Sequence, residues 1–201
     1  MPLLLAKPLP SRVGLDFAKA LFQPTVRAGH LFVWGTVVGA LVWQGGIGAL
    51  ATYKTLGRRE FGKLQAKLFP LYALLTGGGT WLLAASFAAV HHGRILKADS
   101  LAEPTVLQSL LLTGAAVAQA VNHLFVGKRA TQVMYKRHAL EAAEGKEYSD
   151  PTASRQMKEL SAQFGRLHGY SELLNLAVIA AVTVQGFVSA YDVLATSAKW
   201  F

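Results

Sequence analysis

Charged residues are absent from four long stretches of the chain. Residues 28–53, 68–93, 104–127 and 173–191 contain no Asp, Glu, Lys or Arg, and these stretches are 26, 26, 24 and 19 residues long. Because a helix rises about 1.5 Å per residue, about 20 apolar residues cross a hydrocarbon core of about 30 Å. The pattern therefore predicts an all-α membrane protein with four transmembrane helices.

The polar segment 128–172, between the third and fourth stretches, is also predicted to be helical. Gly145 is a helix stop, and Asp150 followed by Pro151 is typical of a helix start. After that start, a seam of residues recurs at alternating spacings of three and four: Met157, Leu160, Phe164, Leu167, Ser171 and Leu174. We therefore expect a helix over 151–195, with spans 3 and 4 extended beyond the membrane as a helical hairpin.

The outer surface of this hairpin is expected to carry charges of both signs. Its members are Lys136, Glu141, Glu144, Lys158 and Glu159. Such a surface is either simply solvated or a docking surface for other protein subunits.

The two ends of the chain are expected to form regions separate from the membrane domain. Residues 1–29 carry four basic residues against the single acid Asp16, with apolar residues at helical spacing. This pattern predicts an N-terminal amphipathic helix that lies at the membrane interface or acts in targeting. The four-span membrane domain then covers residues 30–195, including the hairpin 128–172, and residues 196–201 form a C-terminal tail.

Composition narrows the class of protein. Hydrophobic residues make up 52% of the chain, and the absence of cysteine excludes disulfides, thiolate metal sites and cysteine nucleophiles. The net charge of +9 calls for acidic counterparts, for which we expect anionic membrane lipids or other protein subunits. Nucleic acid is not expected, because the basic residues form no run. The basic composition favours an organelle membrane, with the mitochondrial inner membrane preferred.

Few residues offer catalytic or ligating chemistry. His123 and His168 differ in height by about 13 Å along their helices, too far for one haem iron. His91 and His92 are adjacent, so their side chains point about 100° apart and do not form a helical zinc pair. Hydrogen bonds between helices explain the polar residues inside the stretches: Gln44, Gln108, Gln119, Asn122, His123, Asn175 and Gln185. We expect no catalytic residue, metal or cofactor, and we expect that the protein is not an enzyme.

Glycines are placed where helices are expected to pack. The candidates are Gly35, Gly39, Gly77, Gly78, Gly79 and Gly114. The triplet 77–79 interrupts the second stretch, and it either admits another backbone or kinks a helix beside a cavity. Close packing is the simpler interpretation, because a transport site would normally show a matching break in a repeated half.

Three blocks beside the charge-free stretches resemble a known family. They are FGKLQAKLFPLY at 61–72, Asn122 followed by TQVM at 131–134 and RHALE at 137–141, and FGRLHGYSELLNL at 164–176. In this order and at these spans, they resemble the transmembrane protein 205 family over about residues 30–190. The resemblance implies a four-span fold and a membrane location, and it brings no settled reaction.

The same blocks place polar residues at the positively charged end of the spans. We predict that they form one cluster: Lys63, Gln65, Asn122, Arg137, His138, Arg166, His168 and Asn175. The cluster either binds an anionic headgroup or small anion, or it satisfies helix ends.

The leading hypothesis is a non-catalytic accessory or scaffold subunit of a larger membrane complex, which docks its partner through the hairpin. The alternative is a small-solute or lipid transporter that uses the glycine-interrupted second span and the basic cluster. A redox protein is a third possibility, and it would require haem.

Overall fold

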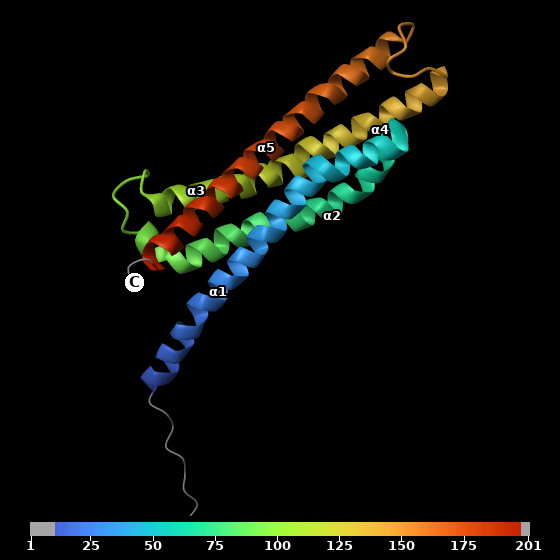
Figure 1. Ribbon diagram of the computed structural model, residues 1–201. Coiled ribbons are helices and arrows are strands. Elements are labelled where there is room, and N and C mark those ends of the chain that lie inside the picture. Colours follow the sequence, from blue (N-terminus) through green and yellow to red (C-terminus); the bar gives the residue numbers. More distant parts are fainter. Residues whose placement is uncertain (1–10, 198–201) are drawn as a thin grey trace, which may run out of the picture.

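The described part of the chain is entirely helical. The computed structural model describes the backbone of residues 11–197 and the side chains of residue 22 and residues 24–191, and these ranges contain no strand. The elements are α1 (Ser11–Val42), the π-helical η1 (Trp43–Ile47), α2 (Gly48–Ile95), α3 (Pro104–Val121), the π-helical η2 (Asn122–Val126), α4 (Gly127–Glu144) and α5 (Arg155–Ser197) (Figure 1). The all-α prediction is confirmed.

The chain reverses direction inside α2, at Gly57. This residue has φ 70° and ψ 171°, a backbone conformation that essentially only glycine adopts. Figure 1 shows α1 and the rest of α2 as antiparallel neighbours that meet at this turn. Val37 of α1 lies so close to Gly79 of α2 that a Cβ at Gly79 would overlap with it. We refer to the reversal at Gly57 as the α1–α2 turn.

Three helical runs in the described part of the chain are long and apolar enough to cross a membrane. They are Pro24–Ile95, Pro104–Glu144 and Arg155–Tyr191, and the first of them, 72 residues long, contains the reversal at Gly57. Large apolar side chains on these runs face outward, among them Phe32 at 76% and Leu74 at 74% exposed. Such exposure is a liability in water and suits contact with lipid.

The core lies where α1, α2, α3 and α5 meet. Leu41, Leu83, Leu112 and Val182 are fully buried there, one from each helix. Trp34 of α1 donates a hydrogen bond from its indole nitrogen to the carbonyl of Val182, at 2.8 Å. This contact fastens the first helix to the last.

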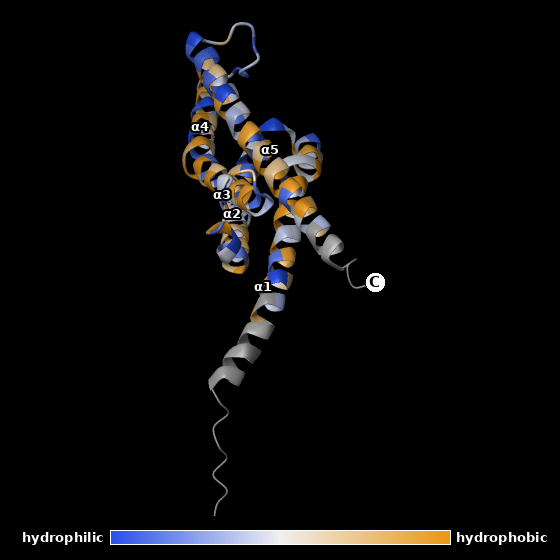
Figure 2. Ribbon diagram, turned by 90° about the vertical axis from the view of Figure 1, so that its left-hand side faces the viewer, coloured by the Kyte–Doolittle hydropathy of each residue, from blue (hydrophilic) through white to orange (hydrophobic). Residues whose placement is uncertain are grey.

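α4 and α5 form an antiparallel pair joined by the loop 145–154. They extend past the α1–α2 turn (Figure 1), and Figure 2 shows hydrophilic residues gathered around their loop. Gly145 ends α4 with φ 65° and ψ 18°, as its position predicted.

The predicted start of α5 at residue 151 is wrong, because the helix begins at Arg155. The carboxylate of Asp150 accepts a hydrogen bond from the Thr152 N–H at 2.7 Å, which makes a turn instead of a helix cap. Ser154 takes the capping role, since its hydroxyl accepts a bond from the Met157 N–H at 3.1 Å.

The glycines predicted to pack helices together differ in how closely other residues approach them. The triplet 77–79 is helical, so the alternative of a kink at these glycines is wrong, and Gly57 is the non-helical residue of α2. Gly79 lies tightly against Val37, and a Cβ on Gly77 would make an ordinary 3.9 Å contact with His123. A Cβ would meet open space within the described chain at the remaining four: Gly35, Gly39, Gly78 and Gly114.

The backbone is helical from Ser11, and α1 runs directly into the first charge-free stretch. Most of the side chains that define the amphipathic pattern of residues 1–29 lie outside the described residues. Of the predicted tail 196–201, α5 includes the first two residues, and 198–201 lie outside the described part of the chain.

Candidate functional site

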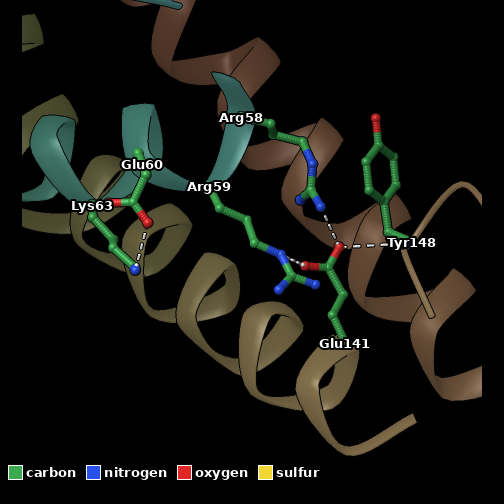
Figure 3. Close-up of polar contacts among 6 residues, drawn as sticks. All are labelled: Arg58, Arg59, Glu60, Lys63, Glu141 and Tyr148. Carbon is green, nitrogen blue, oxygen red and sulfur yellow. Dashed lines mark hydrogen bonds and ion pairs between the residues drawn. The ribbon is translucent and has the colours of Figure 1, made fainter. Parts of the chain in front are cut away.

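The densest group of charged contacts lies where the α1–α2 turn meets α4 and the loop 145–154. We call it the Glu141 junction, and its members are Arg58, Arg59, Arg137, Glu141 and Tyr148. Figure 3 shows Arg58 and Arg59 reaching from α2 to the carboxylate of Glu141 on α4, while Tyr148 approaches from the loop. The α1–α2 turn, more than 80 residues earlier in the sequence, thus meets α4 and the following loop at one side chain.

Glu141 is held by two hydrogen bonds and a further ion pair. Arg58 Nη2 lies 2.7 Å from Oε1, and Arg59 Nε lies 3.2 Å from Oε2. The backbone N–H of Tyr148 also donates to Oε1, at 3.1 Å. The side chain of Glu141 is 0% exposed, whereas those of Arg58 and Arg59 are 20% and 45% exposed. The junction is therefore a buried carboxylate reached by arginines from the surface.

The environment keeps this carboxylate ionised. Glu141 lies beyond the charge-free stretch 104–127. Burial of its side chain, taken alone, would raise its pKa. Hydrogen bonds from the Tyr148 N–H and Arg58, together with the charges of Arg58 and Arg59, outweigh burial and lower the pKa below its ordinary value. Glu141 is consequently a charged anchor at neutral pH.

Arg137 occupies a different position in the junction. It is only 6% exposed, and its guanidinium carbon lies 4.7 Å from the ring centre of Tyr148 and 4.5 Å from that of Phe164. Arg58 also lies over the Tyr148 ring, at 4.5 Å. Within the described chain, Nε of Arg137 and Nη1 of Arg58 are buried and have no hydrogen-bond acceptor. Two aromatic rings lie against the guanidinium of Arg137, whereas Glu141, one helical turn away, forms its ion pairs with Arg58 and Arg59.

The expectation that Glu141 belongs to the solvated face of the hairpin is wrong, because the residue is buried. Ala130, Val133 and Met134 form the buried stripe of α4, and Arg137 and Glu141 continue it at helical spacing. This spacing was the available signal: the stripe predicts burial at both positions whatever the residue type.

Of the eight residues predicted to form one polar cluster, the structure brings Asn122 and Asn175 into direct contact. Asn122, the first residue of η2, donates to Asn175 Oδ1 at 2.9 Å and to the carbonyl of Ser171 at 3.1 Å. Gln65 instead pairs with Gln44 of η1. Each π-helical segment thus contributes one amide that contacts a neighbouring helix. Short π-helical segments are frequent at functional sites.

The other members of the predicted cluster lie apart from that amide pair. Arg137 belongs to the Glu141 junction, and His138 lies beside Gly62. Lys63 is paired with Glu60 at 2.7 Å, and the ring of His168 stacks on Phe164 with centres 5.6 Å apart. Arg166 is exposed on α5. The contacts therefore distribute the eight residues over several places.

A second chain of polar contacts lies toward the opposite end of the bundle. His30 Nδ1 is 2.8 Å from the Ser86 hydroxyl, and Gln185 lies 3.4 Å from the other nitrogen of this ring. Gln185 also donates to Ser189, which in turn donates to Gln108 at 2.9 Å. Hydrogen bonding between helices is thereby confirmed for Gln108 and Gln185.

Two further observations concern ligand chemistry. Gln119 is 0% exposed, and neither atom of its amide has a hydrogen-bond partner within the described chain. Among the described residues, His, Asp and Glu form no group of three that would hold a metal ion.

Comparisons with known proteins agree with the membrane architecture. The family described as "Domain of unknown function (DUF4149)" matches residues 32–139, a range that includes Arg58, Arg59 and Arg137. Transmembrane protein 205 of Danio rerio is 26% identical over 181 residues, which cover 84% of this chain and 89% of that protein. No solved structure matches the chain. The predicted resemblance to the transmembrane protein 205 family is confirmed, and the chain is an integral membrane protein.

Proposed function

This chain belongs to the DUF4149 family, and from that premise we propose that it is a non-catalytic accessory or scaffold subunit of a larger membrane complex. The observation that carries the proposal is the Glu141 junction, which fastens the α4–α5 pair to the α1–α2 turn. A helix pair anchored in this way holds one orientation, and partner binding then costs little ordering entropy.

The proposal includes four membrane crossings and a hairpin outside the membrane. The run Pro24–Ile95 would cross twice, because the backbone reverses at Gly57 and its two arms pack against each other. The Glu141 junction combines four charged side chains, and charges of this number are costly in hydrocarbon. Placing the hairpin 128–172 in water avoids that cost.

The surface of the hairpin suits a protein partner. Tyr135 is 48% exposed on α4, beside the exposed Lys136. Lys158 and Glu159 are exposed on α5. An exposed aromatic residue among mixed charges is the composition of many protein interfaces. Anionic lipids would pair with the basic residues next to the charge-free stretches, and the mitochondrial inner membrane is the location proposed for the complex.

The transporter alternative has less support. It needed a broken second span and an accessible polar site, whereas residues 77–79 are helical and Gln119 is fully buried. The scaffold proposal uses instead the feature that is most developed in the fold, the anchored helix pair.

The test is gentle extraction of the tagged full-length chain from its native membrane, followed by native sizing, mass spectrometry and an absorbance spectrum of the same fraction. We expect a stoichiometric partner that is lost from Lys158→Glu, on the hairpin, and kept by Lys97→Glu, between α2 and α3. A monomer or small homo-oligomer in the wild-type fraction would overturn the proposal. Haem absorbance in that fraction would contradict the non-catalytic assignment.

A further inference from the structure

We propose that the Glu141 junction is also an oxyanion-binding site, in which Arg137 and Arg58 bind phosphate or a phosphomonoester from solution. This inference does not depend on the scaffold role, since it concerns a small ligand rather than a protein partner, but its aqueous source rests on the membrane placement proposed above. It retains Arg137 from the predicted polar cluster and adds Arg58, which the sequence pattern did not single out.

The first argument is charge balance. The junction holds three guanidinium groups and one carboxylate, and that carboxylate is already in contact with Arg58 and Arg59. Arg137 is buried to 6% exposure and has no carboxylate within ion-pair distance among the described residues. Buried charges in proteins are normally paired. An exogenous anion would complete the pairing.

The second argument is the direction of the free donors. The N–H groups of a guanidinium lie in its plane, and its faces stack on aromatic rings. Tyr148 and Phe164 lie against the guanidinium of Arg137, with ring centres 4.7 and 4.5 Å from its central carbon. The rings therefore fix the plane of the donors without using any of them. Nε of Arg137 and Nη1 of Arg58 are both buried without an acceptor in the described chain, as Oε2 of Glu141 is without a donor. An oxyanion that enters the junction would supply acceptors to both arginines.

The third argument concerns the source of the anion. Arg137 is ten residues beyond Gly127, where the third charge-free stretch ends. At about 1.5 Å per residue, this distance is about 15 Å along the helix axis. The polar layer of a bilayer adds only about 5–8 Å on each side of the hydrocarbon core. Headgroup phosphates thus lie short of the junction, which favours a phosphate group in the aqueous phase over a lipid.

The test measures binding of inorganic phosphate to the purified full-length chain in an uncharged detergent. Equilibrium dialysis with radiolabelled phosphate, at constant ionic strength set by chloride, reports binding directly and without reference to stability. We expect saturable binding of one phosphate per chain, weakened about tenfold or more in Arg137→Gln, because charge-assisted hydrogen bonds are lost. Arg166→Gln removes an exposed arginine of α5 as the matched control, and it should bind as the wild type does.

The variants and a vesicle arm separate the outcomes. If Arg137→Gln does not fold, Arg137→Lys keeps the positive charge and removes the planar fork, and it should also bind phosphate more weakly. In a parallel flotation assay, vesicles of phosphatidylcholine with phosphatidic acid test a lipid source. If the protein floats with these vesicles in a manner that depends on Arg137, but does not bind free phosphate, the proposed aqueous source of the anion is overturned. Equal phosphate binding by wild type and Arg137→Gln, or binding by neither, would overturn the site.

Discussion

At the residue scale, Glu141 is the side chain on which most of the junction depends. Its carboxylate accepts from Arg58 and from the Tyr148 N–H, and it lies 3.2 Å from the Nε of Arg59. Removing its charge leaves these cations close together without their counter-ion. The loop 145–154 also loses the partner of its Tyr148 N–H if the side chain turns away. A single substitution therefore acts on α2, α4 and the loop together.

We predict that Glu141→Gln lowers the free energy of unfolding by about 2–4 kcal/mol, because breaking a buried ion pair from one side leaves uncompensated charge. Thermal unfolding of the detergent-solubilised full-length chain, followed by circular dichroism, measures the change. Glu159→Gln is the matched control, since the Arg155–Glu159 pair is 93% and 64% exposed. Exposed pairs contribute about 0–1 kcal/mol, so a loss in the control as large as that in Glu141→Gln would contradict the assignment.

The prediction from residue type alone placed Glu141 wrongly. A glutamate on a polar helix is usually solvated, and the sequence interpretation accordingly put Glu141 on the outer face of the hairpin. Burial followed instead from helical spacing, since Glu141 continues the buried stripe of Ala130, Val133 and Met134. The identity of its partners was not readable, because Arg58 lies 83 residues away and the α1–α2 turn determines which side of α2 it faces. Long-range contacts of this kind depend on the packed fold.

At the element scale, two glycines end helices by different means. Gly145 has φ 65° and ψ 18°, the left-handed conformation common after helices, which asparagine also adopts. Gly57 has φ 70° and ψ 171°, a conformation that only glycine tolerates. The first was predictable as a helix stop. The second lay in a short charged segment with no other turn signal, so its decisive role in the reversal was not recognised.

The two positions therefore respond differently to asparagine. We predict that Gly145→Asn costs at most about 1 kcal/mol, because the left-handed region is open to asparagine. Gly57→Asn should cost about 1–3 kcal/mol or distort the α1–α2 turn. Comparing the thermal unfolding midpoints of the two variants checks this. Equal midpoints would show that Gly57 does not require its observed conformation.

Packing between α1 and α2 gives a further prediction. A Cβ at Gly79 would overlap Val37, whose branched side chain has little rotational freedom in a helix, whereas a Cβ at Gly78 meets open space. Gly79→Ala should lower stability by about 1–3 kcal/mol through overpacking. Gly78→Ala, one residue away in the same helix, should be neutral or slightly stabilising, since alanine has the higher helix propensity. A similar loss in both variants would argue against the observed helix contact.

At the scale of the whole molecule, the helical architecture was predictable because charge exclusion is a strong physical constraint in membranes. Four charge-free stretches predicted the helices, and all of them fall within helical runs of the structure. The predicted polar cluster was not recovered as one unit, because a shared height along the membrane normal does not bring residues into contact. Asn122 and Asn175 meet across two helices, while Gln65 pairs with Gln44 and Arg166 stays exposed.

The proposed topology places the α1–α2 turn and the loop 145–154 on one side of the membrane and the connection between α2 and α3 on the other. The chain has no cysteine, so single cysteines can be introduced without background. Thr55→Cys, Glu147→Cys and Ala102→Cys change residues that are exposed in the structure. With a membrane-impermeant maleimide applied to sealed oriented vesicles, Thr55→Cys and Glu147→Cys should react from the same side. Ala102→Cys should react only from the opposite side or after permeabilisation. Labelling of all three from one side would mean an even number of crossings, or none, between the Gly57 reversal and residue 102. That result would exclude the four-span arrangement. It would also remove the main support for placing the hairpin beyond the membrane.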